Sequence, residues 1–169
     1  MIKRIAITGP ESSGKTELAS YLADYFRDLW VPEFSREYLV EMGLSYRLSD
    51  IEAIARGQFK REEQMISKAK KYLFCDTDFT VTKIWSEVVF GRCPEWIDTR
   101  FNEDHYDLYL LCYPDLPWKP DPLRQNPDNR KDLFLLYQKA LVSIGANFKL
   151  VNGMGDERTQ KAISFVLSL

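Results

Sequence analysis

A short segment near the start of the chain combines two glycines, a lysine and a hydroxyl side chain at fixed spacing. Residues 9–16 read Gly-Pro-Glu-Ser-Ser-Gly-Lys-Thr and match the pattern G-x-x-x-x-G-K-[ST] in full. Glycine lets the backbone curl so that consecutive N–H groups point at one anion. The lysine of this pattern reaches the β- and γ-phosphates of a nucleotide, and the hydroxyl is a ligand for Mg²⁺. The predicted binding residues for ATP and Mg²⁺ are Gly9, Glu11, Ser12, Ser13, Gly14, Lys15 and Thr16, with Thr16 on the metal.

The sequence around this segment has the form that the pattern requires. A β-branched run precedes it and an amphipathic helical pattern follows it, so the positive end of a helix would face the same anion. Further along, strand patterns alternate with helical patterns, which is typical of a parallel sheet covered on both faces. We expect strands at 3–8, near 31, at 72–75, 107–112 and 148–151, and helices from 14, at 48–70, 80–90, 95–105, 130–144 and from about 156. The predicted fold class is therefore α/β, a P-loop NTPase similar to nucleoside and nucleotide kinases.

Two carboxylates follow predicted strands. Asp76 ends the apolar run at 72–75, and Glu33 follows a short run that ends at Val31, with a loop expected after it. Ligands of open α/β folds bind at the carboxyl ends of the strands. We expect Asp76 to hold a water on Mg²⁺ or to contact an acceptor hydroxyl. We expect Glu33 to accept a hydrogen bond or a proton from that hydroxyl, although the sequence does not decide which of the two acts as the base.

Two further charged residues lie close to these carboxylates in the sequence. Asp78 is an alternative to Asp76 in either task and a candidate for contact with the substrate, but an aspartate here is also typical of a helix cap. Arg36 either holds Glu33 or pairs with an anionic group of the substrate. The alternative for Arg36 is an ordinary ion pair on the surface.

The longest helical pattern, residues 48–70, has Ser49 or Asp50 placed to cap it. Gln58 and Glu62 fall within its apolar face, and polar groups on a buried face need partners. We therefore expect both side chains to line a cavity and to contact a small-molecule substrate. The alternative is that the buried face ends at Phe59 and the rest of the helix is solvated.

A proline-rich segment, residues 114–130, contains five of the eight prolines of the chain and shows almost no periodicity. We expect it to be a short lid, because lids of small-molecule kinases exclude water and bring arginines to the transferred phosphoryl group. The candidates are Arg124 and Arg130, one or both, with Trp118 as a substrate contact. The alternative is a plain surface loop.

Composition narrows the possible functions. A chain of 169 residues fits one domain, residues 1–169, and its net charge of −2 does not favour binding to nucleic acid or to an anionic membrane. One histidine excludes a site with paired histidine ligands, and three cysteines without a C-x-x-C pair argue against a disulfide framework. No apolar run is long enough to span a membrane. We expect a cytoplasmic protein whose partners are ATP and a small-molecule acceptor, and the sequence does not predict its oligomeric state.

Five sequence elements together resemble one known family over most of the chain. They resemble the ribosylnicotinamide kinase domain of the bacterial bifunctional NAD-biosynthesis protein and its free-standing P-loop kinase relatives. The elements are Gly9–Thr16, Glu33-x-x-Arg36-Glu37, Ile54-Ala55-x-Gly57-Gln58, Asp76-Thr77-Asp78-Phe79 and Pro117-Trp118-x-x-Asp121-x-x-Arg124.

The resemblance implies a P-loop kinase with a short lid that uses ATP and Mg²⁺. It would phosphorylate the 5′-hydroxyl of nicotinamide riboside and form nicotinamide mononucleotide. The resemblance also implies the roles of matching residues: Lys15 and Thr16 at phosphate and metal, Asp76 at the metal or the acceptor hydroxyl, Glu33 near the ribose, and Arg124 and Arg130 in the lid.

The chain departs from this family beside Glu33. The family has an aromatic residue directly before this position, where it helps to sandwich the nicotinamide ring, and Pro32 stands there in this chain. Trp30 and Phe34 are the nearest substitutes. This departure concerns the acceptor and leaves open a kinase for another nucleoside or small metabolite. An alternative from a different class of function is a regulatory NTP-binding ATPase that is not a kinase.

Overall fold

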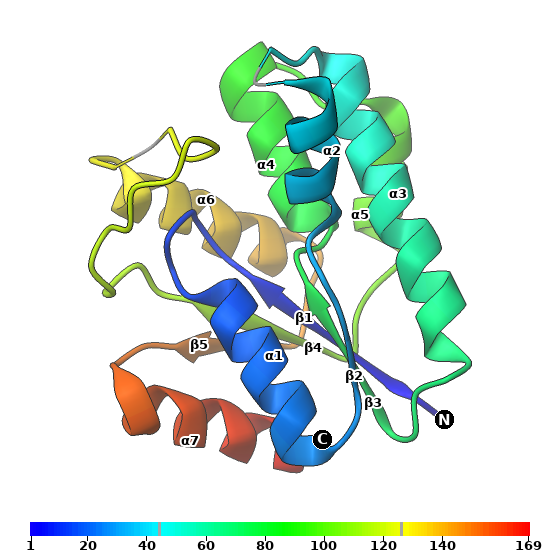
Figure 1. Ribbon diagram of the computed structural model, residues 1–169, viewed down its shortest axis with the longest axis vertical. Helices are drawn as coiled ribbons and strands as arrows, with labels where there is room; N and C mark the ends of the chain where they lie inside the picture. The colour runs from blue at the N-terminus through cyan, green and yellow to red at the C-terminus, as the bar shows by residue number, and fades with distance from the viewer. Residues whose placement is uncertain (44, 126) are drawn as a thin grey trace.

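A parallel β-sheet with helices on both faces organises the chain. The computed structural model describes residues 1–43, 45–125 and 127–169 (Figure 1). Within them, five strands lie in the order β2-β3-β1-β4-β5, and every neighbouring pair is parallel. The strands are β1 (Lys3–Thr8), β2 (Leu29–Val31), β3 (Tyr72–Asp76), β4 (Leu108–Cys112) and β5 (Phe148–Val151). This arrangement confirms the predicted fold class.

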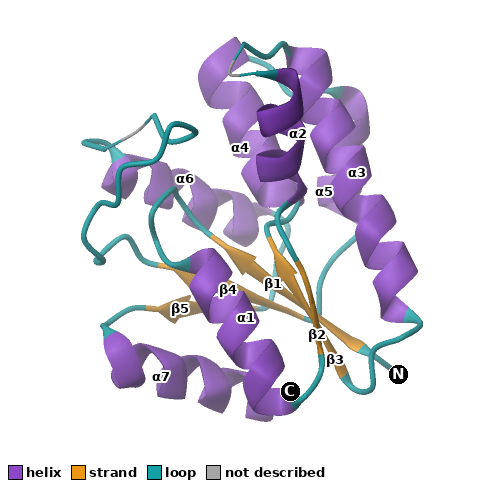
Figure 2. Ribbon diagram, viewed as in Figure 1, coloured by secondary structure: helices purple, strands orange, loops and turns teal. Residues whose placement is uncertain are grey.

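Helices cover the two faces of the sheet (Figure 2). The helices are α1 (Lys15–Phe26), α2 (Phe34–Met42), α3 (Leu48–Ile66), α4 (Phe79–Phe90), α5 (Glu95–Glu103), α6 (Arg130–Ser143) and α7 (Gly155–Leu167). Ile5 and Ile7 of β1 pack on the side of α1 and α7, whereas Ala6 between them packs on the side of α3, α4 and α6. Because side chains alternate across a strand, β1 must be apolar at successive positions to be buried on both faces.

The segment after β2 differs from the expectation of a loop, because residues 34–42 form helix α2. The local sequence gives this helix few buried residues, and its position depends on contacts with α3. A Cβ atom on Gly57 would lie 2.1 Å from Cε1 of the Phe34 ring, so only glycine leaves room for this ring against α3. The Phe34 N–H also donates to Gln58 Oε1 at 2.9 Å. Tertiary contacts therefore stabilise a helix that local periodicity does not indicate.

The other predicted elements are present, with small shifts at their ends. Helix α3 ends at Ile66 instead of residue 70, and Asp50 caps its start by accepting a hydrogen bond from the Arg47 N–H at 2.7 Å. No helix in the described ranges is both long and apolar enough to cross a bilayer. The sheet brings the segments that follow β1, β2, β3 and β4 to one edge, which is where the candidate site lies.

Candidate active site

The loop between β1 and α1 adopts the curled backbone that its glycines permit. Gly9, Ser12 and Gly14 have φ values of 134°, 53° and 78°, in the left-handed region. A Cβ atom on Gly9 would lie 2.7 Å from the carbonyl oxygen of Cys112, and one on Gly14 would lie 2.7 Å from Leu116 Cδ1. Gly9 is therefore required both for its backbone angle and for the close approach of the Cys112 backbone, whereas Gly14 is required for its backbone angle.

The two functional side chains at the start of α1 point to different parts of this site. Lys15 Nζ donates to the carbonyl oxygen of Pro10 at 2.9 Å, so its ammonium group lies across the loop. Thr16 Oγ1 donates to Asp76 Oδ2 at 2.6 Å. The contact joins the two residues that the sequence predicts as metal ligands, although they are 60 positions apart.

The oxygens of this pair fit a Mg²⁺ ion. Asp76 Oδ1 is buried and has no hydrogen-bond partner among the described residues, so it can accept from a water on the metal. Carboxylate and hydroxyl oxygens are ligands that Mg²⁺ prefers, and this ion usually keeps several waters and binds phosphate oxygens. No group of three or more His, Cys, Asp or Glu residues in the described ranges could hold a metal ion alone. The site therefore suits a metal that arrives with a nucleotide.

Burial and a second carboxylate change the protonation of Asp76. Burial, and after it the negative charge of Glu33, raise the pKa of Asp76 to about 6. The hydrogen bond from Thr16 and the positive charge of Lys15 act in the opposite direction but are weaker. A bound divalent cation would favour the ionised carboxylate, because an opposite charge lowers the pKa of an acid.

Glu33 and Arg36 link the start of α2 to the proline-rich segment. Glu33 Oε1 accepts from Ser35 Oγ at 2.6 Å, and its Oε2 lies 3.8 Å from Arg36 Nε. Arg36 Nη1 donates to Asp121 Oδ2 at 2.9 Å. Arg36 thus contacts the carboxylate of Glu33, as one of the two sequence interpretations expects, and at the same time connects α2 with the lid.

A cavity of about 640 Å³ joins these groups, a size that suits a small-molecule site. The phosphate loop and Lys15 line it, and so do Glu33, Arg36 and Arg124. The remaining wall is mainly apolar and includes Leu39, Tyr46, Val81, Ile84, Trp85, Val88, Val89, Leu133 and Tyr137. The cavity therefore has a polar part that suits phosphates and an apolar part that suits an organic group.

An aromatic pair stands in the apolar part. Trp85 Nε1 donates to the Tyr46 hydroxyl at 3.0 Å, and the two rings are 5.0 Å apart in an edge-to-face arrangement. Trp30 packs instead against the core beside α1, and Phe34 packs on α3, so neither lines the cavity. If an aromatic group sandwiches a substrate ring here, Tyr46 and Trp85 are placed to do so.

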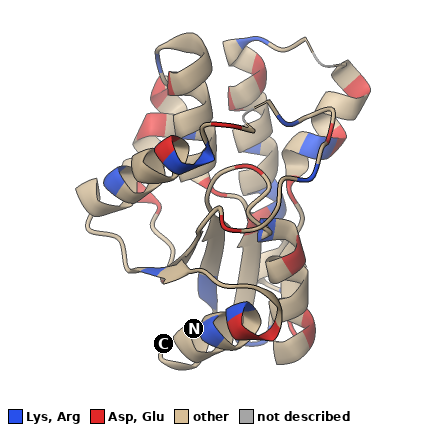
Figure 3. Cartoon of the chain, turned by 90° about the vertical axis from the view of Figure 1, so that its left-hand side faces the viewer, with Lys and Arg blue, Asp and Glu red and all other residues tan. Residues whose placement is uncertain are grey.

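The proline-rich segment lies beside the phosphate loop (Figure 1) and contacts it at several points. The backbone N–H of Lys119 donates to Ser12 Oγ at 2.9 Å, and Lys119 Nζ donates to Glu17 Oε1 at 2.8 Å. The backbone N–H of Gln125 donates to the Glu11 carboxylate at 3.1 Å. Arg124 lines the cavity and donates to the Lys119 carbonyl oxygen at 2.6 Å. Figure 3 shows acidic and basic positions intermixed along this segment and the helices.

Arg130 and Trp118 lie outside the cavity, contrary to expectation. Arg130 Nη1 donates to the carbonyl oxygens of Ser12 and Leu116, both at 3.0 Å. Its guanidinium group lies over the Trp118 ring, 5.7 Å from the centroid. Because its Nη1 donates to both carbonyls, Arg130 supports the phosphate loop in this arrangement.

Gln58 and Glu62 do not line the large cavity; they line a separate pocket of about 10 Å³, which is too small for an organic substrate. Gln58 Oε1 accepts a hydrogen bond from the Phe34 N–H, and Gln58 Nε2 lies 3.5 Å from the Asp76 carbonyl oxygen. Glu62 accepts from Arg4 and from the Tyr106 hydroxyl, both at 2.9 Å. Burial raises the pKa of Glu62 to about 7 in spite of Arg4. These polar groups find protein partners.

Asp78 is the helix cap that the alternative interpretation describes. Its carboxylate accepts hydrogen bonds from the Thr8 hydroxyl at 2.7 Å, from the Thr80 hydroxyl at 2.5 Å and from backbone N–H groups at the start of α4. The residue is buried and lies outside the large cavity. It therefore fixes the direction of α4 and does not contact a substrate there.

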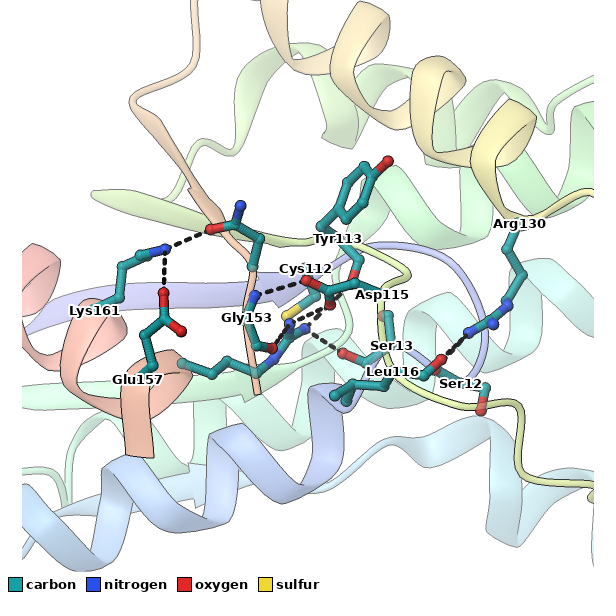
Figure 4. Close-up of polar contacts among 12 residues, drawn as sticks. Ser12, Ser13, Cys112, Tyr113, Asp115, Leu116, Arg130, Gly153, Glu157 and Lys161 are labelled. Atoms are coloured by element: carbon teal, nitrogen blue, oxygen red, sulfur yellow. Dashed lines mark hydrogen bonds and ion pairs between the residues drawn. The ribbon is translucent and has the colours of Figure 1, made fainter. Parts of the chain in front are cut away.

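Sequence reasoning missed a residue that reaches the phosphate loop from the far end of the chain. Arg158 of α7 is 5% exposed, and its Nη2 donates to the Ser13 carbonyl oxygen at 2.6 Å (Figure 4). Its Nη1 donates to Asp115 Oδ1 at 2.9 Å. The partners lie 145 and 43 residues away, so no local pattern could have indicated the contact.

The sheet, the curled loop and the Thr16–Asp76 pair define a P-loop nucleotide-binding domain. Residues 4–158 match the AAA domain family, and the chain belongs to this family. It is homologous to the trifunctional NAD biosynthesis/regulator protein NadR: it is 33% identical over 129 residues to NadR from Salmonella typhimurium (strain LT2) and, equally, to NadR from Escherichia coli (strain K12). Each alignment covers 73% of this chain and 31% of the relative, so the chain spans about a third of the length of these relatives.

Solved structures share the fold. A NadR protein in complex with NAD and AMP-PNP matches with a TM-score of 0.81 and 19% identity, covering 99% of this chain and 49% of that one. A NadR protein in complex with NR matches with a TM-score of 0.80 and 19% identity, over 99% and 51% of the two chains. Deoxyadenosine kinase from M. mycoides matches with a TM-score of 0.66 and 14% identity, over 98% and 100%. The fold is thus that of nucleoside kinases as well as of NadR.

Proposed function

We propose that this chain is an ATP-dependent kinase that phosphorylates the 5′-hydroxyl of nicotinamide riboside and forms nicotinamide mononucleotide. One observation carries the proposal: a single cavity joins the phosphate loop and Thr16 to the Glu33 carboxylate and an aromatic wall, and Thr16 is hydrogen-bonded to the buried Asp76. A nucleotide-binding switch needs no second small-molecule site beside its phosphates. Homology to NadR, whose solved structures contain AMP-PNP in one case and NR in another, supports the choice of acceptor.

Phosphoryl transfer requires mainly positioning and charge stabilisation. The backbone amides of the loop and Lys15 bind the β- and γ-phosphates. Thr16 and Asp76 would hold Mg²⁺, Asp76 through a bound water, and the ion would supply positive charge at the phosphate oxygens. Arg124 lines the same cavity and adds positive charge when the lid is closed over the transferred group.

The acceptor occupies the apolar part of the cavity. Glu33 accepts the hydrogen bond of the 5′-hydroxyl and takes its proton as the hydroxyl oxygen bonds to the γ-phosphorus of ATP, while the bond from that phosphorus to the β,γ-bridging oxygen breaks and ADP leaves. Ser35 and Arg36, which contact the Glu33 carboxylate, hold it in place. Tyr46 and Trp85 offer aromatic surface to the nicotinamide ring, which is flat and positively charged in the riboside.

A panel of acceptors tests the proposal. The purified protein is incubated with MgATP and either nicotinamide riboside, a deoxynucleoside, a ribonucleoside or no acceptor, and ADP and the phosphorylated product are measured. We expect ADP to form in equal amount to nicotinamide mononucleotide. Activity with a deoxynucleoside but not with nicotinamide riboside would show that the acceptor is a deoxynucleoside. ADP formation independent of any acceptor would favour a regulatory ATPase.

A further inference from the structure

The last helix of the chain is tied to the phosphate loop through one buried side chain. Arg158 donates to the Ser13 carbonyl oxygen through Nη2 and to Asp115 and the Gly153 carbonyl oxygen through Nη1. Asp115 in turn accepts a hydrogen bond from the Gly153 N–H at 2.6 Å, so it is held from the same side (Figure 4). The guanidinium group therefore has a fixed orientation and cannot turn toward the cavity.

The bond to the Ser13 carbonyl also sets the direction of an amide. A trans peptide is planar, so a carbonyl oxygen and the N–H of the next residue point in opposite directions. When Arg158 holds the Ser13 oxygen on the outside of the loop, the Gly14 N–H must point to the other side. Among the described residues, the Gly14 amide donates to no protein group, so it remains available for a phosphate oxygen.

The neighbouring peptide is held in the same manner from a different direction. Arg130 donates to the Ser12 carbonyl oxygen from the start of α6, which directs the Ser13 N–H away from that guanidinium group. Two arginines, one from each helix that follows the lid, thus hold two consecutive carbonyls of the loop.

The need for such support follows from the backbone of the loop. Ser12 and Gly14 both have positive φ. This conformation is sterically unfavourable for serine, and for glycine it is one of many accessible conformations, so fixing it costs entropy. A flexible loop would have to become ordered each time a nucleotide binds, and preorganised donors bind more tightly because this cost is avoided. Hydrogen bonds to charged groups are among the stronger ones available for this task.

We infer that Arg158 is a positioning residue that orients the Ser13–Gly14 peptide, so that the Gly14 amide faces the β-phosphate of the nucleotide. The inference rests on the proposed function, because it assumes that the loop binds a nucleotide. Arg158 itself touches no substrate atom. It acts through the loop, and Asp115 acts through Arg158.

The test compares nucleotides that differ in the β-phosphate. Arg158→Met keeps the length of the side chain and removes every donor, Arg158→Lys keeps the charge and one donor group, and Arg56→Met is the matched control on the exposed face of α3. Affinities for MgATP and for AMP are measured by calorimetry, and thermal unfolding is recorded without nucleotide. AMP lacks the β-phosphate, so it reports general damage to the site.

We expect Arg158→Met to lose about tenfold or more in MgATP affinity, or roughly 1.4 kcal/mol, whereas its AMP affinity stays close to that of the wild type. Arg158→Lys should retain an intermediate MgATP affinity, and Arg56→Met should match the wild type. An Arg158→Met protein that is folded and binds MgATP as the wild type does, or that loses MgATP and AMP in the same proportion, would overturn the inference.

Two further results separate the possible failures. If the wild type binds no MgATP, the proposed function fails. If Arg158→Met does not fold, Arg158→Lys and Asp115→Asn decide by the same ratio of MgATP to AMP affinity, because Asp115→Asn weakens only the ion pair that holds the guanidinium group. An unchanged ratio in both of these folded variants would refute the role of Arg158.

Discussion

The two parts of the cavity are built in different ways. The phosphate part consists of backbone groups whose directions are fixed by hydrogen bonds from distant segments, such as those of Arg130 and Arg158. The acceptor part consists mainly of side chains from α2, α4 and the segment between α2 and α3. Val88 and Val89 at its outer rim are each 46% exposed. A backbone site recognises a group that all nucleotides share, whereas a side-chain site can change its specificity by substitution. We therefore expect substitutions in the two parts to separate turnover and nucleotide affinity from acceptor affinity.

The largest effect is expected from Lys15→Ala in the phosphate part. Lys15 is the charge that reaches the transferred phosphoryl group, so its removal should lower kcat on the order of 10³-fold. Lys15 is not part of the apolar core, and circular dichroism and thermal unfolding should therefore match those of the wild type. Near-wild-type turnover in this folded variant would contradict the assignment of the phosphate part.

A somewhat smaller loss of turnover is expected from Asp76→Asn, at the metal-binding pair. Removal of the charge that holds a metal-bound water should lower kcat on the order of 10²-fold or more, with a higher requirement for Mg²⁺. The pKa of Asp76 is about 6 in the metal-free protein, so kcat/KM of the wild type should fall as the pH drops through about 6, because the protonated carboxyl no longer supports the metal. Bound Mg²⁺ lowers this pKa, so kcat should fall only at a lower pH. A pH–rate profile measured at several Mg²⁺ concentrations checks this, and an unchanged profile in Asp76→Asn would exclude Asp76 as the titrating group.

The same substitution should stabilise the fold at neutral pH. The pKa of Asp76 is raised from its ordinary value of 3.8 to about 6, so the folded protein binds this proton more tightly than the unfolded chain does. The stabilisation that comes from the protonated carboxyl is therefore fully present below pH 3.8 and is lost as the pH rises through 6. At pH 8 and without Mg²⁺, the free energy of unfolding of Asp76→Asn should therefore be on the order of 1–3 kcal/mol higher than that of the wild type. Urea unfolding at pH 8 and at pH 4 measures the difference, which should shrink at the lower pH.

Glu33→Gln should lower turnover on the order of 10²-fold and leave the affinity for MgATP unchanged. The Glu33 carboxylate takes the proton of the substrate's 5′-hydroxyl, and a glutamine side chain keeps the shape of glutamate but not its basicity. Steady-state kinetics with each substrate varied in turn separates the two parameters. A large rise in KM for ATP with unchanged kcat would place Glu33 in the phosphate part and would blur the distinction between the two regions.

The smallest effect on turnover is expected from Trp85→Leu, in the aromatic wall. Loss of the aromatic face should raise KM for the acceptor by about tenfold, because contacts with a flat cation contribute on the order of 1 kcal/mol or more when they are buried. KM for ATP in the same variant is the internal control and should not change. Equal increases in both KM values would show that Trp85 supports the whole cavity and not the acceptor alone.

Features that depend on local sequence were predictable. The phosphate loop combines a complete motif with a preceding strand and a following helix, and Asp76 follows an apolar run whose burial is evident from its composition. The Thr16–Asp76 contact confirms that these two segments meet. Parallel strands place their carboxyl ends together, so this part of the site follows from general rules of the fold.

Features that depend on which remote group a buried side chain contacts were not predictable. The pattern on α3 shows correctly that Gln58 and Glu62 are buried, but it does not show whether a substrate or Phe34 and Arg4 satisfy them. Helix α2 was missed because its position depends on the space that Gly57 leaves for an aromatic ring. In each case the deciding atom belongs to a segment that is remote in sequence.

The contact between Arg158 and Ser13 has a consequence for the newly made chain. The two residues are separated by 145 positions, so the ribosome produces the first of them long before the second. Strand β1 likewise pairs with β3 and β4, which are translated much later. A nascent chain must therefore include α7 before its nucleotide pocket acquires its final shape, and until β3 and β4 are made the apolar strand β1 lacks its partners and is prone to aggregation.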